Sequence, residues 1–135
     1  MVIALNTRTI LSVFRDMKEL TYLQVGWGDD EAVQLAEVLP LCTSATELNL
    51  INNKISVRGA KALAAAFAEG AMPKLKELYL TNNQIGDEGA VALAEAVGKG
   101  ALPELKTLDL ATNQIGDEGA KALAAALGKL SLIHI

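Results

Sequence analysis

The chain has 135 residues, a formal net charge of −4 and one cysteine. This length suits a single domain. The negative charge argues against nucleic-acid binding, because that function needs a basic stripe. A lone cysteine excludes an intramolecular disulfide. No apolar run is long enough to span a bilayer, and residues 1–14 lack the features of a signal peptide. We therefore expect a cytoplasmic protein, with the nucleus as the alternative, and neither a membrane nor a nucleic acid as partner.

Residues 1–19 differ from the rest of the chain. A shift of 25 residues places Phe14 on Leu39, which belongs to a helical pattern further along the chain. Thr9 to Lys18 is therefore predicted to be either the helix of a partial, earlier repeat or an N-terminal capping helix. Both alternatives would cover the first edge of an open sheet.

Residues 20–44 predict a short, irregular unit. Leu20, Leu23 and Val25 provide the apolar frame of a strand, and a helical pattern follows until Pro40 ends it. Gly28 stands where the later units carry an asparagine. We expect the turn after this strand to differ from the others.

Three regular units occupy residues 45–74, 75–104 and 105–128. Each follows the pattern L-x-x-L-x-L-x-x-N-x-I, which is complete at Leu75, Leu78, Leu80, Asn83 and Ile85. The alternating leucines predict a strand. A fixed period of 30 residues predicts a stack of similar units rather than one globular core.

A helix is predicted in the second half of each unit. In the second regular unit, Ala90, Leu93, Ala94 and Val97 recur at the spacing of one helix face. Residues 129–135 then depart from the pattern, so we expect an irregular tail of truncated or non-native sequence. We also expect the chain to be a fragment of a longer array.

Short polar side chains stand where the helices begin. Asp87, Asp117 and Ser56 are expected to accept hydrogen bonds from the first N–H groups of their own helices, and Asp29 or Asp30 is expected to do so in the irregular unit. This capping explains the acidic clusters better than a metal site does.

These patterns resemble the leucine-rich repeat family, in particular its ribonuclease-inhibitor-like class, and are similar to the repeat regions of NOD-like receptors and Ran GTPase-activating proteins. The resemblance covers Leu20 to about Leu127. It implies that residues 1–135 form a single α/β leucine-rich-repeat solenoid, a horseshoe arc with a parallel sheet on the concave face and helices on the convex face. It also implies that Asn53, Asn83 and Asn113 form a structural ladder inside the turns.

The chain shows no set of residues for catalysis. The one histidine, His134, lies in the tail, and Cys42 is expected to be a small packed residue. No spacing of Cys, His and carboxylates matches a zinc site. We therefore expect no enzymatic activity, no cofactor and no metal ion.

The concave face is the candidate binding surface. Its predicted rows run Gln24, Asn49, Tyr79, Asp109 and Tyr22, Glu47, Glu77, Thr107. The residues beside these rows are Trp27, Ile51, Thr81 and Ala111. The aromatic residues suit interface anchors, although Trp27 could instead fill the irregular turn beside Gly28.

We expect this surface to make the chain a protein-protein interaction scaffold, with a monomer as the free state. Two alternatives stay open. The chain could be a GTPase-activating regulator of the Ran type, or a sensor fragment of a larger NOD-like receptor.

Overall fold

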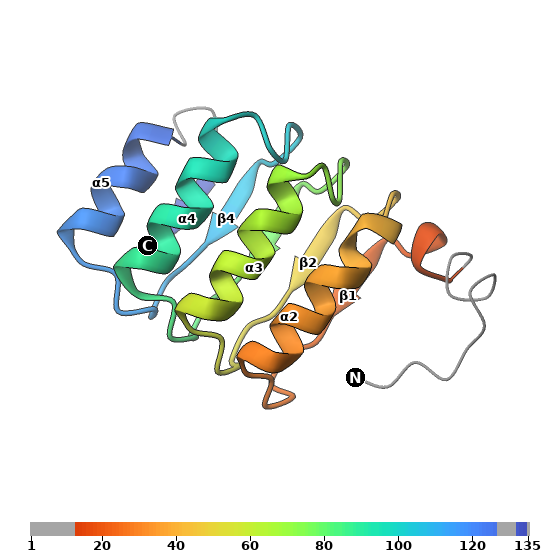
Figure 1. Cartoon of the computed structure of the whole chain (residues 1–135), viewed down its shortest axis with the longest axis horizontal. Helices are drawn as coiled ribbons and strands as arrows, with labels where there is room; N and C mark the ends of the chain where they lie inside the picture. Colours follow the sequence, from red (N-terminus) through yellow and green to blue (C-terminus); the bar gives the residue numbers. More distant parts are fainter. Residues whose placement is uncertain (1–12, 127–131, 135) are drawn as a thin grey trace.

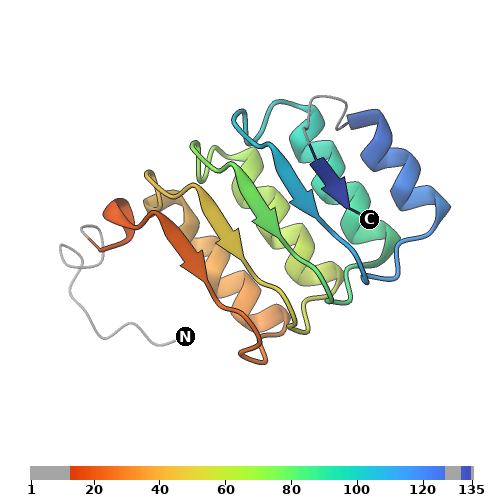
Figure 2. The same cartoon turned by 180° about the vertical axis from the view of Figure 1, so that it is seen from behind.

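The computed structural model of the chain describes residues 13–126 and 132–134, in which short strands alternate with helices (Figure 1). The elements in chain order are β1 (Glu19–Thr21), α2 (Asp29–Val38), the 3-10 helix η1 (Leu39–Leu41), β2 (Glu47–Asn49), α3 (Val57–Ala68), β3 (Glu77–Tyr79), α4 (Gly86–Gly98), β4 (Thr107–Asp109), α5 (Asp117–Ala126) and β5 (Leu132–His134). The helices lie side by side on one face of the sheet, and the opposite face is left open (Figure 2). The predicted α/β solenoid is confirmed.

The sheet contains five parallel strands in the order β1-β2-β3-β4-β5. Leu20, Leu48, Leu78 and Leu108 pair with one another across β1 to β4. Although the tail departs from the repeat pattern, its strand β5 pairs in parallel with β4 from Thr107 onward. Parallel pairing needs only extended backbone with free N–H and C=O groups, so a strand can form outside the repeat pattern.

Leucines of the strands and one face of each helix fill the core. Leu80 is fully buried and Leu78 is 1% exposed, and the helix residues Leu93, Ala90 and Ala94 close the core from the other side. The alanines keep α4 close to the sheet because they add little volume. At the N-terminal end, Phe14 is buried within the short helical stretch at residues 13–16. The rest of the N-terminal segment, residues 1–12, lies outside the described residues.

The predicted strand frame of the first unit is wrong. Leu20 pairs with Leu48, whereas the prediction had placed Leu23 there. Leu23 is 46% exposed and Val25 is 52% exposed, so neither belongs to the core. The leucine frame is filled instead by Met17, Leu20 and Tyr22, a set in which methionine and tyrosine replace two leucines. The sequence offered two apolar frames three residues apart, and packing against β2 selects the less regular one.

The three asparagines of the regular units are buried and bridge neighbouring turns. Asn83 accepts a hydrogen bond from the N–H of Ile55 at 3.0 Å and donates to the carbonyl oxygens of Leu50 and Leu80 at 2.9 and 3.0 Å. Asn53 and Asn113 make the equivalent bonds one unit earlier and one unit later. Each side chain therefore satisfies buried main-chain groups of two units.

The expectation that Asp87 caps its own helix is wrong. Asp87 Oδ1 accepts hydrogen bonds from the N–H groups of Gly116 and Gly119, at 2.7 and 3.0 Å, at the start of the following helix, α5. Asp29 does the same for α3 through Ser56 and Gly59. Carboxylates in the first turns of α2 and α4 thus cap the helices that follow them, and these two caps link neighbouring units.

Glycine is required where α5 receives this cap. A Cβ atom on Gly119 would lie 2.7 Å from Asp87 Oδ1 and 2.8 Å from Ile115 Cγ2, closer than real Cβ contacts allow. The repeated Gly-Asp-Glu-Gly segments therefore encode helix contacts between units.

Candidate functional site: the concave face of the sheet

Two rows of side chains cross the open face of the sheet. Since alternate residues of a strand point to the same face, the pairing of the strands defines the rows. The first row is Glu19, Glu47, Glu77 and Thr107, and the second row is Thr21, Asn49, Tyr79 and Asp109. We call these two rows the concave rows.

The sequence-predicted rows need correction in the first unit only. Glu19 and Thr21 occupy the places that were assigned to Tyr22 and Gln24, because the frame slips by three residues. Tyr22 lies in register with Leu50 and occupies a core position. A tyrosine in place of a frame leucine is the possibility that the prediction from the sequence had not considered.

Tyr22 and Trp27 lie against the core rather than in the rows. Their rings stack with centroids 4.4 Å apart and an angle of 24° between the planes. Both side chains are half-buried and pack against the hydrophobic core. The main-chain N–H of Trp27 donates to Asn53 Oδ1 at 2.9 Å and fixes the turn before α2. The ring of Trp27 packs against the core, in keeping with the packing alternative for this residue.

Three glutamates stand side by side at the N-terminal part of the face. Glu47 pairs in register with Glu19 on one side and with Glu77 on the other. Burial and then the charges of Glu19 and Glu77 raise the pKa of Glu47. Like charges on adjacent strands destabilise a sheet, and among the described residues no lysine or arginine forms an ion pair with this row.

Tyr79 stands at the middle of the second row. Its hydroxyl donates a hydrogen bond to the Glu77 carboxylate. This bond, together with burial and the negative charges of Glu77, Glu47 and Asp109, raises the pKa of Tyr79 to about 12. The phenol is therefore a neutral donor at physiological pH, held in place by the carboxylate row.

The polar side chains next to Tyr79 are partly used by their own strands. Asn49 Oδ1 accepts the N–H of Ile51 at 3.1 Å, and Asp109 Oδ1 accepts the N–H of Ala111 at 3.0 Å. Between these turns, the buried hydroxyl oxygen of Thr81 has no hydrogen-bond partner. Ile51, Thr81 and Ala111 are half-buried at the rim of the face.

The described residues contain no group of three or more His, Cys, Asp or Glu side chains arranged to hold a metal ion. Cys42 is a free, buried thiol, and burial raises its pKa to about 11. A neutral buried thiol is a poor nucleophile. In the part of the chain that the structure covers, no helix is both long and apolar enough to cross a bilayer.

Two solved structures are similar to this chain in fold. The chain superposes on the structure titled leiomodin-1 actin-binding site 2 with a TM-score of 0.79 and 20% identity, over 94% of this chain and 75% of that one. It superposes on the tropomodulin C-terminal domain from Caenorhabditis elegans with a TM-score of 0.78 and 15% identity, over 97% and 83% of the two chains. At these identities the likeness concerns the fold.

Sequence comparison points to the repeats themselves. No curated protein sequence matches the chain. Two family descriptions do match: leucine rich repeats in two copies over residues 73–120, and a leucine rich repeat over residues 42–64. These matches do not overlap, together cover slightly more than half of the chain, and contain the asparagine ladder and the concave rows of the regular units. The chain therefore contains leucine-rich repeats over residues 42–64 and 73–120.

Proposed function

We propose that this chain is a protein-interaction scaffold that binds a basic segment of a partner protein on the concave rows. The observation that carries the proposal is the row of Glu19, Glu47 and Glu77. These carboxylates repel one another across adjacent strands and have no cation opposite them within the described residues. Lysine or arginine side chains of a partner would relieve that repulsion.

The neighbouring side chains support a peptide or protein ligand. Tyr79 donates a hydrogen bond to Glu77 and offers an aromatic ring beside the carboxylates. Tyrosine is a frequent anchor in interfaces, because it buries much area with few rotatable bonds. A basic partner would thus meet charge from the first row and an aromatic anchor from the second.

Actin is the first partner to test. The leiomodin-1 structure to which this fold is similar is an actin-binding site by its title. This likeness, at 20% identity, supports the choice of actin as a probe. The choice of the concave rows as the binding surface rests on the charges of this chain's own residues.

The test compares the binding of two probes to the wild type and to a variant carrying Glu47→Gln and Glu77→Gln. The probes are filamentous actin, measured by co-sedimentation, and a fluorescein-labelled lysine-rich peptide of twenty residues, measured by fluorescence anisotropy. Each substitution keeps the side-chain shape and removes one charge. We expect at least one probe to bind about ten-fold more weakly to the variant, since a loss of about 1.4 kcal/mol corresponds to that factor.

A matched control carries Glu95→Gln and Glu104→Gln, two exposed glutamates outside the concave rows. It has the same net charge as the test variant and should bind as the wild type does. Equal weakening in both variants would show that bulk charge, not this face, controls binding. If neither probe binds the wild type, or if the test variant binds both as tightly as the wild type, the proposal is wrong.

The location, the oligomeric state, the repeat class and the absence of enzymatic activity are also untested. We propose a cytoplasmic location, because the single cysteine is buried and unpaired. The monomeric state stays a prediction. The ribonuclease-inhibitor-like class, the Ran-type GTPase-activating activity and the receptor-fragment alternative stay predictions. The absence of enzymatic activity is likewise a prediction, in keeping with a family of binding repeats.

A further inference from the structure

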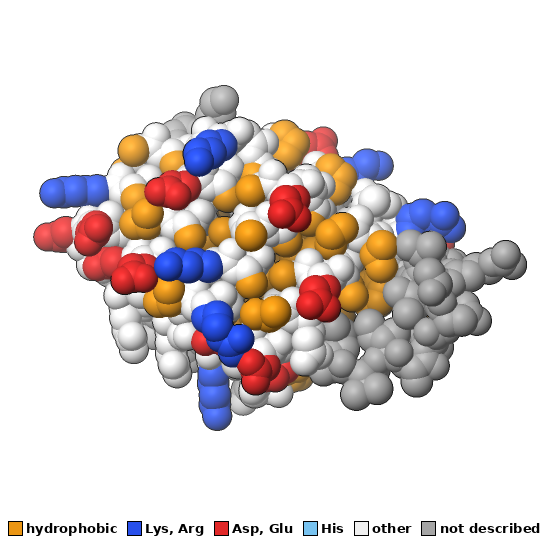
Figure 3. All heavy atoms as spheres, viewed as in Figure 1, with side chains coloured by type: hydrophobic (Ala, Val, Ile, Leu, Met, Phe, Trp, Pro, Cys, Tyr) orange, Lys and Arg blue, Asp and Glu red, His pale blue; other side chains and the backbone are white. Residues whose placement is uncertain are grey.

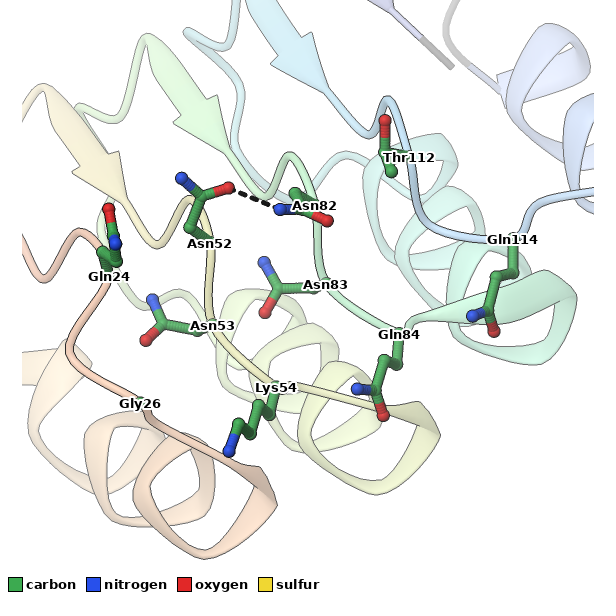
Figure 4. Close-up of a pocket in the computed structure, with 10 residues that line it drawn as sticks. All are labelled: Gln24, Gly26, Asn52, Asn53, Lys54, Asn82, Asn83, Gln84, Thr112 and Gln114. Carbon is green, nitrogen blue, oxygen red and sulfur yellow. Dashed lines mark hydrogen bonds between the residues drawn. The ribbon is translucent and has the colours of Figure 1, made fainter.

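A groove lies beside the concave rows, where the chain leaves the strands and turns toward the helices (Figure 4). Its volume is about 530 Å³. The exposed side chains that line it belong to four successive units: Gln24, Asn52, Asn82, Gln84, Thr112 and Gln114. Lys54 is the one charged residue in this lining, and the lining contains no aromatic residue. We call this surface the carboxamide groove.

The turn geometry explains only part of this choice of side chains. Gln24, Asn52, Asn82 and Thr112 all have positive φ angles, between 55° and 59°. Glycine and asparagine adopt this conformation readily, whereas a β-branched residue such as threonine is strained in it. Asn52 and Asn82 therefore suit the turn. Gln24 and Thr112 carry a long or branched polar side chain where the backbone alone would favour glycine or asparagine.

The exposed carboxamides also differ from the buried ones in their bonding. The buried ladder residues Asn53 and Asn83 bond to the main chain. In the groove, Asn82 Nδ2 donates to Asn52 Oδ1 at 2.7 Å, as the dashed line in Figure 4 shows. Within the described part of the chain, the side chains of Gln84 and Gln114 make no hydrogen bond of this kind, so their donors and acceptors face solvent.

The chemistry of the groove suits the main chain of a peptide. A carboxamide presents one acceptor oxygen and two N–H donors, which match the N–H and C=O of a peptide unit without any net charge. Extended polyproline-II chains have no internal hydrogen bonds, so their peptide groups are free to bond to such side chains. A phosphate or carboxylate ligand would find only Lys54 as a countercharge.

The spacing of the units also fits this conformation. Parallel strands lie about 4.8 Å apart, so every second unit is separated by about 9.6 Å. One turn of polyproline II contains three residues and advances by about 9.3 Å. The side of such a helix that faces the groove would therefore meet Gln24 and Asn82, which are two units apart.

We propose that the carboxamide groove binds the main chain of an extended, uncharged peptide segment in the polyproline-II conformation. The segment runs across the units, roughly perpendicular to the strands. Three unit spacings correspond to about five residues of such a peptide. This site is separate from the concave rows and does not depend on the function proposed for them.

The probe for the test is a neutral, fluorescein-labelled peptide of twelve residues with the repeat Pro-Ala-Gln, acetylated and amidated at its ends. Binding is measured by fluorescence polarisation. The test variant carries Asn82→Gly and Gln84→Ala. Glycine tolerates the positive φ at position 82, so the first change removes the carboxamide without straining the turn. Far-UV circular dichroism checks that the variant is folded.

We expect the peptide to bind the wild type and to bind the test variant at least ten-fold more weakly. Raising the salt to 0.5 M should change the affinity less than two-fold, since the contacts are uncharged. Gln34→Ala, which removes an exposed carboxamide from α2 outside the groove, should bind as the wild type does. The variant with Glu47→Gln and Glu77→Gln should also keep its affinity for this peptide, which separates the two proposals.

An analogue of the peptide with N-methylated amides tests main-chain recognition directly, because it lacks the N–H donors. We expect it not to bind. The proposal is wrong if the wild type does not bind the parent peptide, if the analogue binds equally well, or if the groove variant keeps the full affinity. Equal displacement of the peptide by a neutral cello-oligosaccharide would also overturn it and would indicate a site for hydroxyl groups.

Discussion

At the scale of single residues, the negative charge of Glu47 is unfavourable at its position in the sheet. Its carboxylate lies between Glu19 and Glu77 in adjacent strands. Burial and these charges raise its pKa. The folded protein therefore holds the Glu47 proton more tightly than the unfolded chain does. The stability that this tighter proton binding contributes is present at low pH, and it is lost as the pH rises through the raised pKa of Glu47.

We therefore expect Glu47→Gln to stabilise the protein at pH 7, by about 0.2–1 kcal/mol, the range for like charges on adjacent strands. At pH 3.5 the two proteins should differ little, because Glu47 is then protonated in both states. Urea unfolding at the two pH values measures the difference. Glu104→Gln, an exposed glutamate outside the sheet, should change stability little at either pH. A loss of stability on Glu47→Gln at pH 7 would contradict the electrostatic argument.

At the scale of the elements, the links between helices are uneven. Asp29 caps α3, and Asp87 caps α5. The matching position in α3 is Val57, which has no carboxylate for α4. The N–H of Gly86, at the start of α4, instead donates to the carbonyl oxygen of Asn113 at 2.8 Å. The caps thus join α2 to α3 and α4 to α5, and the α3–α4 junction lacks this bond.

Asp87→Ala and Asp117→Ala form a matched pair, since both lie in the same local sequence, Ile-Gly-Asp-Glu-Gly-Ala. Each aspartate lies in the first turn of its own helix, but only Asp87 bonds to a following helix within the described residues. We expect Asp87→Ala to cost about 0.5–2 kcal/mol, the range for a lost cap. Asp117→Ala should cost less. Thermal unfolding followed by circular dichroism measures both, and equal losses would rule out a stabilising cap between units.

At the scale of the whole molecule, each unit buries its leucines against its neighbours, so no unit has a closed core of its own. The leucines at the matched sheet positions form one continuous core from β1 to β4. Leu80 is fully buried near the middle of this array. In such a stack, stability is carried by the contacts between adjacent units, and a defect in one unit is felt by the next.

We expect Leu80→Ala to lower the free energy of unfolding by about 2–5 kcal/mol, because it leaves a cavity in the core. Trp27 is the only tryptophan and lies in the first unit, far along the chain from Leu80. If the array unfolds as one cooperative unit, Trp27 fluorescence and far-UV circular dichroism should show the same urea midpoint, and both should shift in the variant. A Trp27 transition that stays unchanged would indicate that the first unit unfolds independently.

Binding follows from the same arrangement at this scale. The helices cover one face of the sheet and leave apolar and charged side chains mixed on their outer surface (Figure 3). The opposite face and the adjoining turns carry the concave rows and the carboxamide groove. Each unit contributes one residue to each concave row and exposed side chains to the groove, so a ligand that spans several units meets the same side-chain position repeatedly.

The sequence by itself determined the α/β solenoid, because leucine spacing, helix periodicity and the recurring asparagine agree in three units. It also placed Glu47, Asn49, Glu77, Tyr79, Thr107 and Asp109 in the correct rows, since a strict period fixes the pairing of like positions. The division of the chain into units stays a prediction.

Only the tertiary structure decided the register of the first strand and the partners of the aspartates. Leu23 and Val25 match the leucine frame as well as Met17 and Tyr22 do, and only packing against β2 distinguishes the two sets. Asp87 precedes one helix in sequence, yet its carboxylate reaches the start of the next helix. Periodicity specifies which residues are equivalent, whereas contacts between units depend on the distance at which neighbouring backbones pack.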